Sequence, residues 1–129
     1  MNIEFRGGGR SKTVLVVDDD PMVLETLSMS IKSFGYNVVQ AREGREALTC
    51  ISVQEVDLLF TDMVMPQGLS GEELAKRVWQ DRPELPVVFT TGLGDVALPF
   101  ADKKTATTSL LKKPYRRVEL GRMLHAHLG

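Results

Sequence analysis

The stretch VLVVDDDP, residues 14–21, joins four consecutive apolar residues to three acidic residues and a proline. An apolar run without polar alternation is typical of a strand that is buried on both faces, as in a parallel sheet. Asp20 can cap a helix and Pro21 suits the first helical position, so a helix is expected to start here. The stretch therefore predicts a buried strand that leads directly into a helix.

The same succession of an apolar run and an amphipathic segment continues along the chain. Strands are predicted at Thr13–Val17, Asn37–Gln40, Asp57–Thr61, Val87–Thr90 and Ser109–Lys112. Helices are predicted at about Pro21–Phe34, Gly44–Val53, Gly71–Gln80, Asp95–Lys103 and Arg116–Leu128. Strict alternation implies parallel strands, because each parallel return needs a crossover, and the crossover helices cover the sheet. The predicted fold class is α/β, with a doubly wound sheet of five parallel strands.

Length and composition fit one domain that is preceded by a tail. The chain has 129 residues, of which 43% are hydrophobic, and this is enough for a single buried core. Residues 1–10 lack periodicity and contain the triplet GGG at 7–9, so they are predicted to be a flexible tail or a linker remnant. The domain is expected to span residues 11–129.

Charge and hydropathy narrow the classes of partner and location. The chain has 16 basic and 17 acidic residues and a net charge of −1, so composition gives no case for nucleic acid or an anionic membrane as a direct partner. No apolar run approaches the roughly 20 residues that span a bilayer, and the start lacks the apolar middle of a signal peptide. The cytoplasm is the expected compartment. Cys50, the lone cysteine, is expected to be structural.

Polar side chains follow four of the predicted strands at the point where each strand ends. They are Asp18, Asp19 and Asp20 after the first strand, Asp62 after the third, Thr91 after the fourth and Lys113 after the fifth. The carboxyl ends of parallel strands meet at one edge of the sheet, where ligands bind in open α/β folds. We therefore expect these side chains to converge.

The converging groups indicate phosphoryl chemistry. Carboxylates about 4 Å apart repel each other by roughly 4 kcal/mol at an effective dielectric constant near 20, so the cluster needs a cation or raised pKa values. Oxygen ligands without histidine or cysteine favour Mg²⁺, with Mn²⁺ as an alternative. A carboxylate, a hard divalent cation, a lysine and a hydroxyl are together what phosphoryl transfer to an aspartate requires.

Each residue also has a simpler explanation when it is taken alone. Asp20 can be a helix cap, Lys113 a solvated surface lysine and Thr91 a turn residue. Asp62 is harder to explain in this way, because a carboxylate at the end of a buried strand needs a partner. The joint pattern carries the functional interpretation.

Four motifs together resemble the receiver domain of response regulators and of hybrid histidine kinases. They are VLVVDDDP at 14–21, DLLFTDMVMP at 57–66, VVFTTG at 87–92 and LKKPY at 111–115, and the resemblance extends over about residues 12–128. It implies the strand order 2-1-3-4-5 of a flavodoxin-like (βα)5 three-layer sandwich. It also implies two-component signal transduction, in which a histidine kinase or a phosphotransfer domain donates a phosphoryl group.

The resemblance assigns a role to each residue that matches a motif. Asp62 resembles the phosphoacceptor, Asp19 the acidic residue that contacts the metal ion directly, and Asp18 the second member of the acidic pair. The backbone carbonyl of Val64, two residues after the acceptor, would be a further ligand of Mg²⁺. A metal site made by these four residues is therefore implied.

Two further residues would act on the phosphoryl group. Thr91 resembles the hydroxyl residue that moves to it, and Lys113 resembles the lysine that binds its oxygen. Lys113 is assigned in preference to Lys112 because it directly precedes Pro114, which follows a cis peptide bond in this family. The surface of the last two predicted helices and the last strand is expected to contact a downstream protein.

The sequence departs from the commonest family pattern at three places. Leu110 stands where many response regulators have an aromatic switch residue, and the loop QGLS at 67–70 is slightly longer than usual. Val64 and Leu93 offer no polar group to position a hydrolytic water, which predicts slow loss of phosphate. The motifs look most like receivers fused to histidine kinases, so we expect the C-terminal receiver of a hybrid sensor kinase or a stand-alone response regulator.

Two other functions fit the same fold. A phosphatase with an aspartyl nucleophile would resemble Asp-x-Asp-x-Thr after the first strand, and the sequence DDDPM at 18–22 does not continue in that way. A pseudo-receiver would only bind partners, and the complete set of acidic, hydroxyl and lysine residues argues against it. Continuous turnover would indicate the first alternative, and no phosphorylation at all the second.

Three other side chains have structural interpretations. His125 and His127 lie two residues apart on a predicted helix, so they point to different faces and are predicted at the surface rather than as a metal pair. Trp79 is predicted to cover the core.

Overall fold

The computed structural model describes residues 11–66, 68–92 and 108–129. The strands are β1 Thr13–Val17, β2 Asn37–Ala41, β3 Leu58–Asp62, β4 Val87–Thr91 and β5 Thr108–Lys112. The helices are α1 Pro21–Ser33, α2 Gly44–Val53, α3 Gly71–Asp81 and α4 Arg117–Leu128. The tail predicted at residues 1–10 and the helix predicted at 95–103 lie outside the described residues.

All five strands form one parallel sheet. Their order is β2-β1-β3-β4-β5, so the predicted 2-1-3-4-5 order is confirmed. Every residue of β1 is buried, because this strand has a neighbour on each side and helices over both faces. The consecutive apolar residues that predicted a doubly covered strand thus have the expected environment.

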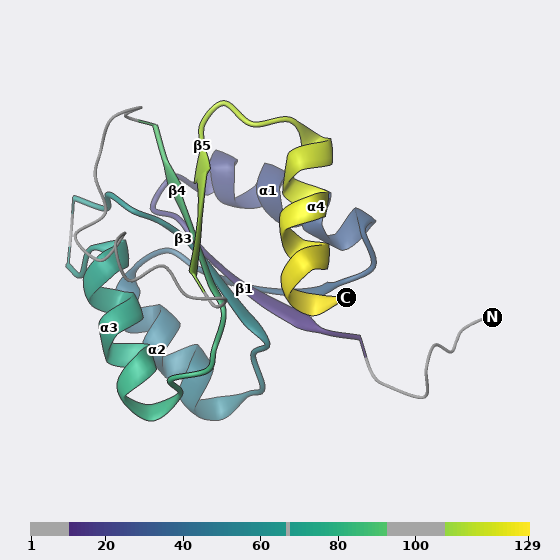
Figure 1. Ribbon diagram of the computed structural model, residues 1–129. Helices are drawn as coiled ribbons and strands as arrows, with labels where there is room; N and C mark the ends of the chain where they lie inside the picture. The colour runs from purple at the N-terminus through teal and green to yellow at the C-terminus, as the bar shows by residue number, and fades with distance from the viewer. Residues whose placement is uncertain (1–10, 67, 93–107) are drawn as a thin grey trace.

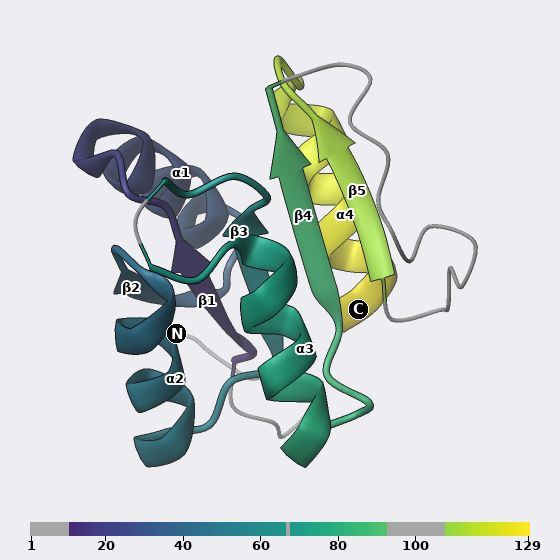
Figure 2. The same cartoon turned by 90° about the vertical axis from the view of Figure 1, so that its left-hand side faces the viewer.

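The helices form two layers around the sheet. α1 and α4 cover one face, and α2 and α3 cover the other (Figure 1 and Figure 2). Each face has its own apolar cluster: Leu27, Ile31 and Leu120 lie in the first, and Leu74 and Val78 in the second. The prediction of a three-layer sandwich is confirmed.

The start and the end of α1 follow the predicted local chemistry. Asp20 Oδ1 accepts hydrogen bonds from the backbone N–H groups of Met22 (2.9 Å) and Val23 (3.4 Å), which would otherwise lack partners in the first turn. Gly35 adopts a φ of +99°, a conformation that side chains disfavour, just after the helix end. A rigid helix therefore begins directly beside Asp18 and Asp19.

A close contact sets the separation of α1 from α4. Gly121 of α4 faces the ring of Phe34, and a Cβ atom at position 121 would lie 2.8 Å from Phe34 Cε1. The Arg117 guanidinium lies over the same ring, 4.5 Å from its centre, and donates a short hydrogen bond to Ser33 Oγ. The end of α1 and the first half of α4 are thereby held together.

Two predictions about single side chains have different outcomes. Trp79 packs against the cluster on the α2 and α3 face, and its Nε1–H donates to the Leu85 carbonyl at 2.9 Å, which confirms its place over the core. His125 is exposed as predicted, but the prediction for His127 is wrong, because this residue is half-buried with Nε2 2.8 Å from Ser109 Oγ. The end of α4 packs beside β5, and this burial lowers the pKa of His127.

No helix among the described residues combines the length and the apolar character needed to cross a membrane.

Candidate functional site

Three carboxylates meet at the carboxyl edge of the sheet. Val17 of β1 lies opposite Thr61 of β3, so the next residues, Asp18 and Asp62, are brought side by side by the sheet register. Asp18, Asp19 and Asp62 each place a carboxylate oxygen within 4.8 Å of those of the other two. The structure therefore brings together the three acidic residues that the sequence predicted as metal ligands.

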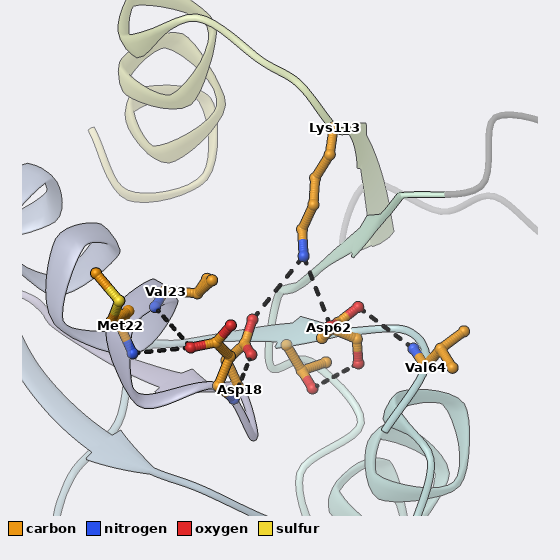
Figure 3. Close-up of polar contacts among 8 residues, drawn as sticks. Asp18, Met22, Val23, Asp62, Val64 and Lys113 are labelled. Atoms are coloured by element: carbon orange, nitrogen blue, oxygen red, sulfur yellow. Dashed lines mark hydrogen bonds and ion pairs between the residues drawn. The ribbon is translucent and has the colours of Figure 1, made fainter. Parts of the chain in front are cut away.

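Lys113 reaches the same cluster from the end of β5. Its Nζ lies 3.6 Å from Asp62 Oδ2 and 3.9 Å from Asp18 Oδ2, so it bridges the two strands (Figure 3). The backbone N–H of Lys113 donates to the Thr91 carbonyl at 2.8 Å, which fixes this residue beside β4. The Lys113–Pro114 peptide bond is cis, as predicted.

Burial and neighbouring charges both act on Asp18. Asp18 is buried, with an exposed fraction of 3%. Its pKa is raised, first by burial and then by the negative charge of Asp62, although a hydrogen bond from the Asp20 N–H (2.9 Å) and the charge of Lys113 act in the opposite direction. One lysine does not offset three carboxylates, so a divalent cation would relieve the repulsion.

The donor set fits a hard cation. Carboxylate oxygens and a backbone carbonyl are ligands that Mg²⁺ accepts, and at such sites Mg²⁺ usually retains waters and contacts a substrate phosphate. Val64 is half exposed beside the cluster, and its backbone N–H lies 3.4 Å from Asp62 Oδ1. The backbone of Val64, the residue whose carbonyl is the predicted ligand, therefore starts next to Asp62 (Figure 3).

Thr91 and Leu110 occupy the positions expected from the topology. Thr91 ends β4 and is buried, on the same edge of the sheet as Asp62. Leu110 is half-buried and packs against the cluster on the α2 and α3 face. Leu93, the second residue in the prediction of slow phosphate loss, lies outside the described residues.

Two residues near the site lie in or close to the motifs but were given no role from the sequence. A Cβ atom at Gly71 would collide with the backbone carbonyl of Asp62, so the close return of the chain after the acceptor requires glycine. Burial, together with the negative charges of Asp18 and Asp62, raises the pKa of Tyr115 to about 12. Its place in the motif LKKPY was the available signal, because the effect of neighbouring charges on a pKa is not visible in a sequence.

Comparison with known proteins identifies the family to which this chain belongs. The sequence model described as "Response regulator receiver domain" matches residues 14–125, so the chain belongs to this family of two-component signal transduction. The chain is 34% identical over 101 residues to the transcriptional regulatory protein GlrR of Escherichia coli K12, with 78% of this chain and 22% of the relative covered. It is 35% identical over 107 residues to the response regulator MprA of Mycolicibacterium vanbaalenii, with 83% and 46% covered.

Solved structures agree with this assignment. The chemotaxis protein CheY4 of Vibrio cholerae has a TM-score of 0.80 at 27% identity, covering 92% of this chain and 100% of that one. The receiver domain of a signal transduction histidine kinase from Syntrophus aciditrophicus has a TM-score of 0.77 at 26% identity, covering 92% and 90%. This chain spans only 22% and 46% of the length of the two regulators named above.

Proposed function

We propose that Asp62 accepts a phosphoryl group from the phosphohistidine of a histidine kinase or a phosphotransfer domain, in the presence of Mg²⁺. The observation that supports this most directly is the sheet register, which places Asp62 beside Asp18 with the Lys113 ammonium between them. A nucleophile, a cation site and a fixed positive charge then face one point at the edge of the sheet.

The transfer needs little covalent chemistry from the protein. An oxygen of Asp62 attacks the phosphorus, a new O–P bond forms as the N–P bond breaks, and the imidazole nitrogen keeps the electron pair. Lys113 neutralises negative charge that gathers on the phosphoryl oxygens, and Thr91 provides a hydroxyl at the same edge. Asp18, Asp19, Asp62 and the Val64 carbonyl would hold Mg²⁺ or Mn²⁺, which supplies further charge neutralisation when bound.

The phosphorylated receiver would act on a protein partner rather than turn over a substrate. A groove between β5 and α4 supports a readout through this face. Its lining includes the apolar Leu110 and Met123 and the charged residues Lys112, Glu119 and Arg122. The half-exposed, apolar Val64 supports slow self-dephosphorylation. As part of this proposal, the chain serves in the cytoplasm, as the C-terminal receiver of a hybrid sensor kinase or as a stand-alone regulator.

The test is phosphorylation by a small phosphodonor such as phosphoramidate, followed by intact-mass measurement. Wild type with Mg²⁺ should gain one acid-labile phosphoryl group, and Asp62→Asn should gain none. Asp57→Asn is the matched control, because Asp57 lies at the opposite end of β3 and should not affect incorporation. A wild-type protein that stays unmodified with Mg²⁺ would reject the proposal, and continuous release of phosphate would favour an enzyme.

A further inference from the structure

The loop between β3 and α3 carries the predicted carbonyl ligand between two anchored residues. Met63 and Met65 are both buried, with exposed fractions of 5%, whereas Val64 between them is 53% exposed. The alternation pins the backbone on both sides of Val64 into the apolar cluster beneath α2 and α3. These two anchors place the start of the loop, and a separate contact holds its far end.

The far end of the loop is held by a contact with the start of α2. Leu69 is buried, and a Cβ atom at Gly44 would lie 2.8 Å from Leu69 Cβ and 3.1 Å from Leu69 Cδ1. The Leu69 side chain thus occupies the space that any side chain at position 44 would take. Gly44 is the first residue of α2 and is not among the glycines with a positive φ, so packing rather than backbone conformation requires it.

The start of α2 also borders the other side of the acidic cluster. Asp19 lines a small pocket together with Arg42, Glu43 and Glu46. The Arg42 N–H donates to Glu46 Oε1 at 2.8 Å, which closes the turn between β2 and α2. This turn is therefore next to Asp19 and, through Gly44, in contact with the loop that carries Val64.

We propose that Leu69 and Gly44 are positioning residues that hold the Val64 peptide in place relative to Asp19 and Asp62. The inference rests on the proposed function, because it concerns the affinity of the same site for Mg²⁺. Mg²⁺ demands near-ideal octahedral geometry, whereas Ca²⁺ accepts flexible geometry and a variable number of ligands. Contacts that orient ligands without touching a metal ion typically change its affinity about 10- to 100-fold.

The experiment compares two variants that disturb this contact from opposite sides. Leu69→Ala removes most of the buried side chain, and Gly44→Ala inserts a methyl group into the space that Leu69 fills. Leu85→Ala is the matched control, because Leu85 lies in the same apolar cluster but precedes β4, at the opposite end of the sheet. Calorimetric titration with MgCl₂ and with CaCl₂ gives the Kd values, and thermal unfolding in EDTA gives the stability of each protein without metal.

The expected result is a Kd for Mg²⁺ about 10-fold higher in both variants, with a smaller change for Ca²⁺. Leu85→Ala should lose comparable stability and keep the wild-type Kd. If Leu69→Ala does not fold, Gly44→Ala decides, since alanine is favourable within a helix. Folded variants with the wild-type Kd, or with equal losses for both ions, would overturn the inference alone. A wild-type protein that binds no Mg²⁺ would overturn the proposed function and the inference together.

Discussion

Asp57 and Asp62 lie at opposite ends of β3, and their carboxylates have different surroundings. At the amino end, Asp57 Oδ2 accepts a hydrogen bond of 2.8 Å from the backbone N–H of Thr13. At the carboxyl end, Asp62 shares one lysine with Asp18, while Asp19 adds a third negative charge. At the amino end of the sheet, a backbone N–H of the protein itself hydrogen-bonds the carboxylate. At the carboxyl end, three carboxylates lie close together, and a bound ligand could neutralise their charge. Charge that the fold does not balance is therefore the better guide to function.

The largest expected effect concerns Lys113, the positive charge at the carboxyl end. Lys113→Met should slow phosphorylation of Asp62 by about 100-fold, because it removes a preorganised charge that stabilises the transferring group. The rate of phosphoryl incorporation from phosphoramidate measures this effect.

Lys112→Met is the control for that prediction. Lys112 is the exposed neighbour of Lys113, and among the described residues the ion pairs to Asp18 and Asp62 come from Lys113. Its removal should therefore leave the rate close to wild type. Equal losses in the two variants would show that general surface charge, not the position of Lys113, governs the reaction.

Magnesium should stabilise the protein through the carboxyl end alone. An ion at 100 times its Kd stabilises the folded state by about 2.7 kcal/mol, which corresponds to a rise in Tm of roughly 10 °C for a domain of this size. Asp18→Asn should lose most of this rise and Asp57→Asn should retain it. Thermal unfolding with MgCl₂ and with EDTA distinguishes the two, and an unchanged response of Asp18→Asn would contradict the assignment of the site.

The amino end should matter for stability rather than for chemistry. Asp57→Ala should lower the free energy of unfolding by about 2 kcal/mol, because it leaves the buried Thr13 N–H without this acceptor. Urea unfolding measures the loss, and Asp57→Asn, which keeps an oxygen acceptor, should lose less. A marked fall in the phosphorylation rate of folded Asp57→Ala would contradict the prediction that Asp57 affects stability alone.

The smallest expected effects are two pH dependences of opposite sign. Burial lowers the pKa of His127 below its usual 6.5, so the unfolded chain binds more protons and stability is lost as the pH falls below about 6.5. The pKa of Asp18 is raised above 3.8, so its contribution is full below pH 3.8 and is lost as the pH rises through the raised value.

Urea midpoints measured between pH 4 and 8 without metal would resolve these two contributions. His127→Gln should reduce the loss of stability that occurs below pH 6.5. Asp18→Asn should reduce the opposite change in stability at lower pH. A His127→Gln protein with the full wild-type loss would show that the histidine does not titrate with folding.

The sequence predicted the sheet well because local chemistry decides it. Buried strands appear as consecutive apolar residues, and the cap and proline at the start of α1 are local signals. Several predicted boundaries moved by one residue, among them both ends of β3 and the start of α4. Asp57 precedes β3 and binds the Thr13 N–H, and Arg116 caps α4 rather than starting it.

Contacts between distant segments could not be predicted in the same way. His127 is half-buried because β5 lies beside it. The spacing of His127 from His125 could not predict the contact with Ser109, which is distant in the sequence. The packing of Leu69 on Gly44 likewise depends on a loop and the start of α2, which only the folded chain brings together. Sequence motifs predicted the reacting groups, whereas the residues proposed to hold them in place emerged from the packing.

The fit of Gly121 against Phe34 has a consequence for sequence variation among relatives. A Cβ atom at position 121 would lie only 2.8 Å from the Phe34 ring, which is closer than van der Waals contact allows. Position 121 therefore has no room for a residue larger than glycine while residue 34 is aromatic. Gly121→Ala should be tolerated best together with a smaller residue at 34, so the two positions are expected to covary. Such a pair would register as strongly constrained in a mutational scan although neither side chain takes part in phosphoryl transfer.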